Sequence, residues 1–485
     1  MTILDTLADE KLFAPFFPDP TSWRSWRVFL AASFGIPLSA DDLDIYARHT
    51  GRSAVPGLPA REAWVVVGRR GGKSRIAALV SVYLACFRDY RRILTPGERG
   101  TLPVIAADRR QARAVFGYIT GLLESVPMLS RMVQHRTREA VELTNGVRIE
   151  VHTASFRSIR GYTLIGAVCD EIAFWRADDS ANPDTEILNG LRPGMATVPG
   201  SLLLAISSPY ARRGALWDVY RRYYGQDGNV LVWKGDTRSM NPLVAADVID
   251  EAYERDAAAA EAEFGAEFRR DIEAFIAQEV VEAVVVPGRY ELPPRSSETY
   301  FAFCDPSGGS SDSMTLAIAH HENGRAVLDC VREMTPPFSP DHVVREFAAT
   351  LSDYGVSVVV GDRYAGEWPV DAFRRHGIEY EPAERTKSDL YMSFLPLLNS
   401  RRIELLEHPR LFRQLCGLER RTAWGGRDSV DHGPGGHDDV ANAAAGALIA
   451  VAEAPDEGIV MGINLVPEAR KRIAWEEDFA FSGLR

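Results

Sequence analysis

The segment WVVVGRRGGKS at residues 64–74 constrains the fold more than any other part of this chain, because a short apolar strand leads through glycines into an apolar helical stretch. A glycine-rich turn at such a junction gathers free backbone N–H groups at the positive end of a helix dipole, which favours an anion. The lysine and serine that follow can reach the phosphates of a nucleotide and its Mg²⁺ ion. The segment therefore predicts a loop that binds ATP with Mg²⁺. Its residues are Gly68, Arg69, Arg70, Gly71, Gly72, Lys73 and Ser74.

The glycine spacing of this loop differs from the standard G-x-x-x-x-G-K-[ST] pattern. Val67 occupies the first glycine position, and Gly68 comes one residue later. By the pattern alone, a chance glycine-rich turn is the alternative interpretation.

Two later apolar runs, LIGAVCDE and LLLAISS, supply the partners that a nucleotide site needs. The first ends in Asp170 and Glu171. We expect Asp170 to hold the Mg²⁺ ion, usually through water, and Glu171 to orient and deprotonate the attacking water. The second ends in Ser207 and Ser208, small hydroxyl residues that are placed to sense the γ-phosphate.

The order of these runs predicts an α/β fold with a mostly parallel sheet, because from residue 64 to 232 short β-branched runs alternate with helix-like stretches. A chain of 485 residues exceeds what one hydrophobic core organises. Residues 243–277 are rich in Ala and Glu and are helical in composition, and Pro and polar residues then cluster in VVVPGRYELPPRSSE. We place the domain boundary there.

A second group of candidate residues consists of carboxylates spread over the C-terminal half. Asp305 ends the strand YFAFCD, Asp362 ends VSVVVGD, and Asp438 and Asp439 open a helix after the turn HGPGGH. The first of these strands opens a predicted antiparallel meander. Hydrolysis of phosphodiesters by two metal ions needs carboxylates that hold the ions about 4 Å apart, and Mg²⁺ or Mn²⁺ suits oxygen ligands. The alternative is that each Asp is a turn or N-cap residue.

Three further residues near these carboxylates are candidate members of the same site. Asp312 lies just beyond the first turn, His437 precedes the acid pair, and Glu367 follows the second strand. For Asp312 a structural role is supported at least as well as a role in the site, and for His437 and Glu367 a solvated role is the preferred interpretation. We expect the metal ligands to be Asp305, Asp362 and one of the pair Asp438 and Asp439, with Asp439 preferred.

The motifs G-R-R-G-G-K-S, R-G-Y-T-L-I-G-A-V-C-D-E and I-S-S-P-Y-A-R-R-G, in this order, resemble the motor of terminase large subunits, which package the DNA of tailed bacteriophages. In that family a variant loop with an internal Arg is normal. The segments D-P-S-G-G and H-D-D resemble its nuclease motifs. The resemblance implies an arginine finger at Arg160, with Arg69 and Arg70 as alternatives, and an adenine-binding region near Trp23. It also implies an RNase H-like second domain with two Mg²⁺ or Mn²⁺ ions.

The resemblance further implies a biological role and a domain order. ATP hydrolysis would drive double-stranded DNA into a procapsid, and the nuclease would cut concatemeric DNA. The implied partners are a small terminase subunit, a portal protein and further copies of the chain in a ring. We expect a lead-in at 1–60, a P-loop ATPase domain at 61–240, a helical subdomain and linker at 241–297, an RNase H-like nuclease domain at 298–455 and a tail at 456–485.

Composition sets limits on these interpretations. The net charge of −12 argues against a protein coated with nucleic acid, so any DNA contact must be local. Candidate arginine clusters are Arg109, Arg110 and Arg113, then Arg212 and Arg213, and Arg221 and Arg222. Five scattered cysteines without a C-x-x-C pair suggest neither disulfides nor structural zinc. The apolar runs are too short to span a membrane. We expect a soluble protein of the host-cell cytoplasm.

Two other functions fit parts of the sequence. One is a P-loop ATPase-nuclease of DNA repair or transposition, which helicase-type motifs after Ser208 would favour, and none is found. The other is a non-catalytic DNA-binding assembly module, against which the intact Lys73, Glu171, Asp305 and Asp362 argue.

Overall fold

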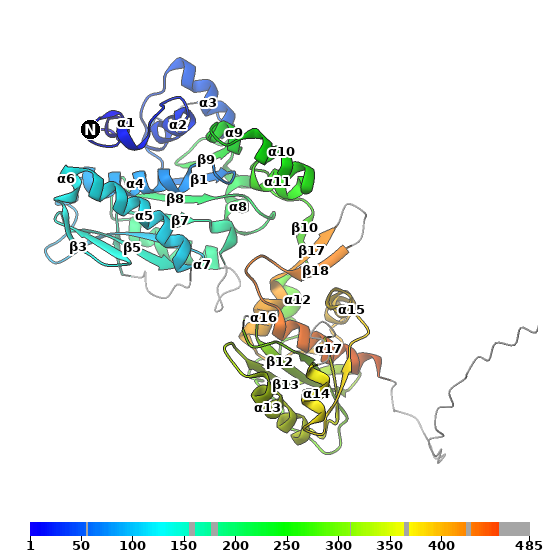
Figure 1. The fold of residues 1–485 in the computed structure, drawn as a ribbon. Coiled ribbons are helices and arrows are strands. Elements are labelled where there is room, and N and C mark those ends of the chain that lie inside the picture. Colours follow the sequence, from blue (N-terminus) through cyan, green and yellow to red (C-terminus); the bar gives the residue numbers. More distant parts are fainter. Residues whose placement is uncertain are drawn as a thin grey trace, which may run out of the picture.

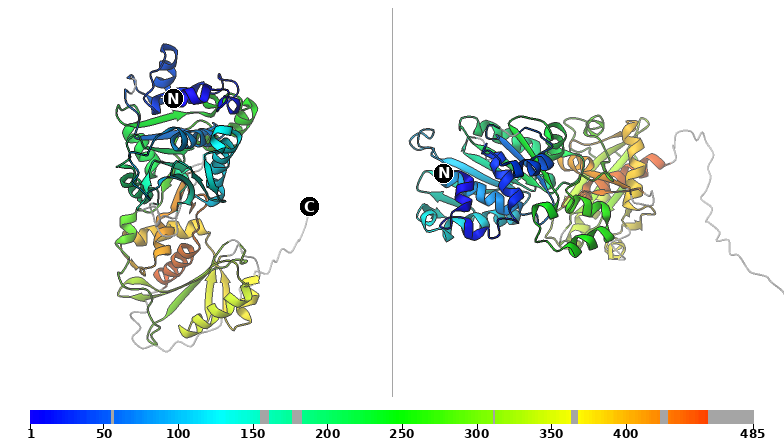
Figure 2. Two further views of the ribbon diagram at one scale, coloured as in Figure 1. Left: turned by 90° about the vertical axis from the view of Figure 1, so that its left-hand side faces the viewer. Right: turned by 90° about the horizontal axis from the view of Figure 1, so that it is seen from above.

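The computed structural model describes residues 1–54, 57–154, 161–175, 183–310, 312–362, 368–422 and 428–454. These residues form two α/β lobes joined end to end through a small three-stranded sheet (Figure 1). The same division is visible in the two turned views of Figure 2. The sheets confirm the fold class predicted from the sequence, a mostly parallel sheet in the first lobe and a mixed sheet in the second.

The sheet of the first lobe has the strand order β3-β4-β5-β2-β7-β8-β1-β9, with β6 paired to β2. All strands from β5 to β9 in this order run parallel, and β3 and β4 are antiparallel additions at one edge. The strands are β1 (Glu62–Val67), β2 (Gly100–Ala106), β3 (Val133–Arg136), β4 (Ala140–Leu143), β5 (Val147–Thr153), β6 (Thr163–Leu164), β7 (Gly166–Asp170), β8 (Leu202–Ser207) and β9 (Val230–Gly235). Because β8 lies between β1 and β7, the serines at its end face both the phosphate loop and the acid pair.

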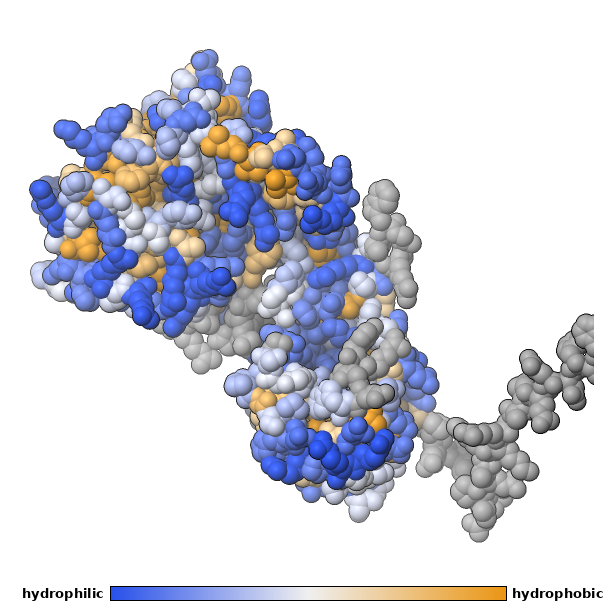
Figure 3. Space-filling model, viewed as in Figure 1, coloured by the Kyte–Doolittle hydropathy of each residue, from blue (hydrophilic) through white to orange (hydrophobic). Residues whose placement is uncertain are grey.

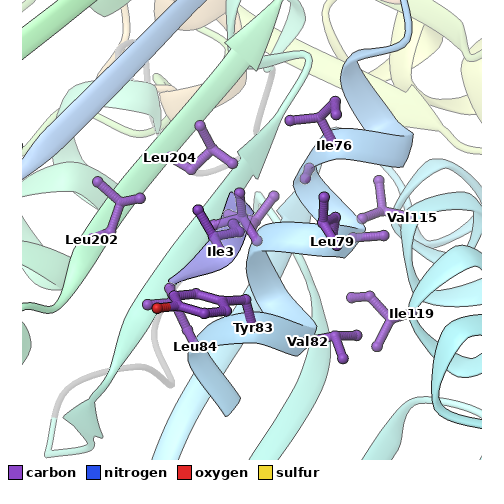
Figure 4. Close-up of a cluster of buried hydrophobic side chains, with 14 of the residues drawn as sticks. Ile3, Ile76, Leu79, Val82, Tyr83, Leu84, Val115, Ile119, Leu202 and Leu204 are labelled. Atoms are coloured by element: carbon purple, nitrogen blue, oxygen red, sulfur yellow. The ribbon is translucent and has the colours of Figure 1, made fainter. Parts of the chain in front are cut away.

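Helices cover both faces of this sheet, as continuous apolar strands require. One face carries α4 (Lys73–Phe87) and α5 (Arg109–Ser125), together with α1 (Ile3–Ala8), α2 (Arg24–Ser33) and α3 (Ala40–Thr50). Figure 4 shows side chains of α1, α4, α5 and β8 meeting in this core. They include Ile3, Ile76, Leu79, Val82, Tyr83, Val115, Ile119, Leu202 and Leu204. The opposite face packs against α7 (Pro183–Met195) and α8 (Gly214–Tyr223). The residues before the phosphate loop are therefore part of the first lobe's core.

The segment predicted as a helical subdomain and linker, 241–297, is divided between the two lobes. The helices α9 (Thr237–Met240), α10 (Ala246–Arg255) and α11 (Ala257–Glu263) lie beside the phosphate loop (Figure 1). The strand β10 (Ile272–Ala274) and α12 (Gln278–Glu282) join the second lobe, where residues 275–284 enter its core. The helical composition of 243–277 thus ends before β10.

The sheet of the second lobe has the order β15-β14-β11-β12-β13-β16. Its strands are β11 (Tyr300–Asp305), β12 (Met314–Glu322), β13 (Arg325–Met334), β14 (Val358–Gly361), β15 (Glu379–Pro382) and β16 (Ile403–Glu404). The first three form the predicted antiparallel meander, and β14 runs parallel to β11. Asp305 and Asp362 therefore follow neighbouring parallel strands at the same sheet edge.

Helices and a short sheet complete the second lobe. The helices are α13 (Pro340–Asp353), α14 (Trp368–Arg374), α15 (Lys387–Asn399), α16 (Pro409–Cys416) and α17 (Asp439–Glu453). The alanine-rich α17 is buried against β11 to β13, which small side chains permit. The strands β17 (Leu418–Thr422) and β18 (Asp428–His432) form a hairpin, and β10 pairs with β17 at the junction of the lobes (Figure 1).

The surface is largely hydrophilic in the view of Figure 3, with an apolar patch where Figure 1 places α9 and α10. Leu243 and Val248 are among the exposed apolar side chains there. Within the described ranges, no helix has the length and hydropathy to cross a bilayer. The predicted tail at 456–485 lies outside the described residues.

Candidate active sites

The phosphate loop is shaped by two glycines and by the segment 237–264. Gly72 adopts a left-handed φ of 94° and caps α4, and Arg70 also has a positive φ of 62°. A Cβ at Gly68 would lie 2.3 Å from the Thr237 hydroxyl and 2.6 Å from the Phe264 carbonyl oxygen. Only glycine fits there, so the shifted glycine position reflects packing of the loop against the helices that follow β9.

Lys73 is the first residue of α4, and its ammonium is buried in the loop. It donates hydrogen bonds to the carbonyl oxygens of Val67 at 2.8 Å and Gly68 at 3.2 Å, and to the Ser208 hydroxyl at 2.9 Å. Its Nζ lies 3.7 Å from a carboxylate oxygen of Glu171. Burial lowers the pKa of Lys73, and the neighbouring carboxylates oppose this effect. Its hydrogen-bond acceptors are neutral groups, which a phosphate can replace.

The acid pair at the end of β7 is held by the serines at the end of β8. Glu171 accepts hydrogen bonds from the Ser208 backbone N–H at 3.0 Å and the Ser207 hydroxyl at 3.1 Å. Glu171 has a left-handed φ of 50°, a backbone strain of about 1–3 kcal/mol that is common at functional sites. Burial, followed by the charge of Glu171, raises the pKa of Asp170 to about 7.

Asp170 has a buried carboxylate oxygen, Oδ1, without a hydrogen-bond partner among the described residues. An unpaired buried carboxylate is costly, and a cation bound beside it removes the cost. The oxygen therefore fits the predicted Mg²⁺ of a nucleotide. Ser74, the other predicted ligand, follows Lys73 in the first turn of α4.

Aromatic residues of the lead-in, residues 1–60, contact the phosphate loop and the start of α4. Trp26 donates its indole N–H to the Gly71 carbonyl oxygen at 2.8 Å. A Cβ at Gly72 would lie 3.3 Å from the Trp23 ring, and the Arg75 guanidinium lies 5.2 Å from that ring's centroid. The region predicted to bind adenine thus lies beside the loop.

The candidates for the arginine finger differ in their surroundings. Arg69 pairs with Glu263 at 3.1 Å, and the Arg70 carbonyl oxygen accepts a hydrogen bond from Asn241 at 2.7 Å. Arg160 lies outside the described residues. Arg69 is thus engaged with its own chain.

Four predicted aspartates meet at one end of the second lobe's sheet. Asp305 accepts a hydrogen bond from Asn442 at 2.9 Å, one turn along α17 from Asp439. Burial raises the pKa of Asp305 well above its ordinary value, and the charges of Asp439, Asp362 and Asp438 act in the same direction. The four aspartates are therefore close enough for the charges of three of them to act on Asp305.

The two neighbours Asp438 and Asp439 have different environments. Asp439 keeps a buried oxygen, Oδ2, without a hydrogen-bond partner among the described residues, and burial followed by the charge of Asp438 raises its pKa to about 6. Asp438 accepts the Tyr391 hydroxyl at 2.9 Å and pairs with Lys387 at 3.1 Å. Burial lowers the pKa of Lys387, but Asp438 and Asp431 raise it above its ordinary value. The oxygen available to a metal ion is therefore that of Asp439.

Two of the three further candidates near the aspartate cluster, His437 and Asp312, lie close to each other. His437 Nδ1 lies 3.6 Å from Asp312, and both side chains are largely exposed. The charges of both residues act on Asp439. Glu367 lies outside the described residues.

The two sites are connected through the junction of the lobes. The loop after Ser208 carries Tyr210, which donates its hydroxyl to the buried Glu419 of β17 at 2.7 Å, and Arg213, which forms an ion pair with the same carboxylate. A cavity of about 340 Å³ lies here, lined by Trp175 and Tyr210 of the first lobe and His437 of the second, among other residues. Arg213, one of the arginines named as a possible DNA contact, thus pairs with a carboxylate across the junction of the lobes.

The other predicted basic cluster is also engaged. Arg109 and Arg113 lie 3.5 Å and 3.0 Å from the carboxylate of Glu139. These pairs are exposed, so they contribute at most about 1 kcal/mol each and can be exchanged for phosphates.

Several functional residues were missed by sequence reasoning. Asn442 lies three residues after Asp439, a helical spacing that places both on one face, so the sequence held a signal for it. Lys387, Tyr391 and Asp431 have no such signal, because only tertiary packing brings α15 to β18 and α17.

Comparisons with known proteins give matches among solved structures. No protein-family model matches the chain, and neither does any curated protein. The large terminase of bacteriophage HK97 is 16% identical, covers 87% of this chain and 99% of its own, and has a TM-score of 0.36. The large terminase of a thermophilic bacteriophage is 14% identical, covers 89% of this chain and 99% of its own, and has a TM-score of 0.40.

A third structure matches the second lobe. The large terminase nuclease of the thermophilic phage G20c is 17% identical, covers 36% of this chain and 96% of its own, and has a TM-score of 0.32. All three TM-scores lie below 0.5, so the function has to be inferred from the side chains of the two sites. The family that the sequence motifs indicate, the bacteriophage large terminases, is nevertheless also the family of these solved structures to which the chain is similar.

Proposed function

We propose that this chain is a terminase large subunit, an ATP-hydrolysing motor that moves double-stranded viral DNA into a procapsid and a metal-dependent endonuclease that cuts concatemeric DNA. The observation that carries the proposal is the presence, in one chain, of a lysine-bearing phosphate loop facing an acid pair and of a separate cluster of aspartates at a sheet edge. Each site leaves one buried carboxylate oxygen, on Asp170 or Asp439, in a position that a divalent cation suits.

In the motor, the chain's own residues divide the work by their positions. Lys73, which contacts Ser208 and the loop carbonyl oxygens, would bind the β- and γ-phosphates of a nucleotide, and Asp170 and Ser74 would hold its magnesium ion. Glu171, fixed by Ser207 and Ser208, orients and deprotonates water. Arg160, Arg69 and Arg70 remain the candidates for the arginine finger.

In the nuclease, Asp305, Asp362 and Asp439 are the proposed metal ligands. Metal ions held there would activate water and stabilise the leaving oxygen of the phosphodiester. Asn442 fixes one oxygen of Asp305 and leaves the other for a metal ion. Structures of the phage G20c nuclease include forms with bound magnesium and bound cobalt, and those of a thermophilic phage terminase include ADP and ATP-γ-S complexes. These ligands agree with the proposed cofactors, ATP with Mg²⁺ and Mg²⁺ or Mn²⁺ ions.

The remaining parts of the proposal follow from the motor role. The proposed partners are double-stranded DNA, a small terminase subunit, a portal protein and further copies of the chain arranged as a ring, and the proposed compartment is the host-cell cytoplasm.

The test is a set of matched variants of the full chain. DNA-stimulated ATPase activity should be lost in Lys73→Ala and Glu171→Ala and kept in Asp305→Ala, whereas Mg²⁺- or Mn²⁺-dependent plasmid cleavage should be lost in Asp305→Ala and kept in Lys73→Ala. Absence of both activities from the wild type would favour a DNA-binding assembly module. ATPase with strand separation but without packaging would favour the repair enzyme.

A further inference from the structure

A fixed positive charge lies beside the aspartate cluster of the second lobe. Lys387 is the first residue of α15, and its Nζ lies 2.8 Å from an oxygen of Asp431 and 3.1 Å from an oxygen of Asp438. One turn later, Tyr391 donates its hydroxyl to Asp438 at 2.9 Å. The buried carboxylate of Asp438 is thus balanced by side chains of the protein itself.

The partners of Lys387 have the geometry of a cation site. Asp431, His432 and Asp438 each present one ligand atom, and these three atoms lie within 4.8 Å of one another. Carboxylate oxygens with an imidazole nitrogen suit Mn²⁺. The ammonium of Lys387 already contacts two of the three groups, and charge repulsion excludes a divalent ion from the same oxygens.

The lysine is held in this place by secondary structure on both sides. Thr386 caps α15 through a capping box, and the Ser388 hydroxyl accepts a hydrogen bond from the backbone N–H of Val430 in β18 at 2.9 Å. A positive charge at a helix N-terminus is unfavourable by itself, so Lys387 stays there because of its carboxylate partners. The start of α15 therefore clamps β18 to the start of α17.

We propose that the ammonium of Lys387 takes the place of a divalent ion at Asp431, His432 and Asp438, and that it thereby turns the start of α17 so that Asp439 faces Asp305. Lys387 is then a positioning residue, and it explains why the two neighbouring aspartates differ. The effect of Lys387 on catalysis rests on the proposed nuclease function, whereas the exclusion of a divalent ion by Lys387 does not.

The experiment counts Mn²⁺ ions bound to the nucleotide-free full chain, from the electron paramagnetic resonance signal of unbound Mn²⁺. Lys387→Met removes the charge and keeps most of the stem. We expect Lys387→Met to bind one Mn²⁺ more per chain than the wild type, and Lys387→Met with Asp431→Asn to return to the wild-type count. Lys387→Arg, which keeps the charge, should also bind the wild-type number.

Two results would overturn the proposal. One is an equal count in the wild type and Lys387→Met. The other is a wild-type count that drops by one ion in Asp431→Asn alone, because an ion would then already occupy the place assigned to the lysine. The second result does not need a folded Lys387→Met protein, and ATPase activity reports the folding of the first lobe in every variant.

Cleavage assays on the same proteins separate this inference from the nuclease proposal. If Lys387 positions Asp439, Lys387→Met should raise the Mg²⁺ concentration for half-maximal plasmid cleavage about tenfold, as for other residues that support metal ligands. Without any wild-type cleavage, a gain of one Mn²⁺ in Lys387→Met would still support the exclusion of an ion and would contradict the nuclease function alone.

Discussion

The acid pairs 170–171 and 438–439, one in each lobe, have similar surroundings but face lysines with different further contacts. In each pair one carboxylate faces the ammonium of a lysine that begins a helix, Lys73 or Lys387. The other carboxylate keeps a buried oxygen without a hydrogen-bond partner among the described residues and has a raised pKa. Two unrelated sheets thus arrive at the same arrangement, in which one acid is balanced and its neighbour is left for a cation.

The difference lies in what else each lysine contacts. Lys73 donates to carbonyl oxygens and a hydroxyl, which cost about 1 kcal/mol each to give up. Lys387 contacts two carboxylates, of which Asp438 is buried and Asp431 is partly exposed, and a lysine that leaves such charged partners loses more than one that leaves neutral partners. From this difference in partners we infer that Lys73 can leave its contacts for a ligand more readily than Lys387 can.

The largest expected effect separates the two acids of the second pair. Asp439→Asn should lower plasmid cleavage about 1000-fold, equivalent to about 4 kcal/mol, because a direct metal ligand is lost. Asp438→Asn should lower it about tenfold, because it only loosens the clamp on Lys387. Single-turnover nicking of supercoiled plasmid at saturating Mg²⁺ measures both. Equal losses, or a greater loss in Asp438→Asn, would show that the balanced acid is the ligand.

A stability measurement against pH tests the raised pKa of Asp439. An acid whose pKa is raised on folding destabilises the folded state increasingly as pH rises from about 4 through about 6. In metal-free buffer the unfolding free energy of Asp439→Asn should therefore exceed that of the wild type by about 1 kcal/mol at pH 4.5 and by up to about 3 kcal/mol at pH 7.5. Urea titrations at both pH values measure this, and added Mn²⁺ should reverse the order at pH 7.5. A difference that does not change with pH would contradict the assignment.

The contact between the lobes gives an intermediate effect. Tyr210→Phe removes one hydrogen bond to the buried Glu419 carboxylate and should cost about 2 kcal/mol of unfolding free energy. Tyr118→Phe, at an exposed tyrosine, is the matched control and should cost nothing measurable. Urea denaturation followed by tryptophan fluorescence compares the two variants. If Tyr210→Phe were as stable as Tyr118→Phe, the hydrogen bond between Tyr210 and Glu419 would not stabilise the junction of the lobes.

The smallest expected effect concerns the mobility of Lys73. Ser208→Ala removes an acceptor that Lys73 holds only without nucleotide, so ATP binding should tighten about fivefold, equivalent to about 1 kcal/mol. Isothermal titration with a slowly hydrolysed ATP analogue measures the change, with the exposed Ser130→Ala as control. Weaker binding would indicate that the Ser208 hydroxyl serves the nucleotide directly.

The two sites differ in how far the sequence could predict them. The residues of the phosphate site lie within three short segments, so the order of these segments along the chain indicated their place in the fold. For the second site, four aspartates could be named, but successive residues at a helix start point about 100° apart, and which of two faces the site depends on where α17 begins. Lys387 could not be found, because nothing local marks a lysine whose partners come from β18 and α17.

Gly68 limits how the phosphate loop can be exchanged between this chain and a related protein. A side chain at position 68 would collide with the Thr237 hydroxyl and the Phe264 carbonyl oxygen. The phosphate loop and the segment 237–264 therefore have to match each other in sequence. The standard pattern does not require glycine at this position, and a transplanted loop with any other residue there would place a side chain in that contact. A chimera that keeps its ATP site has to take both segments from the same parent.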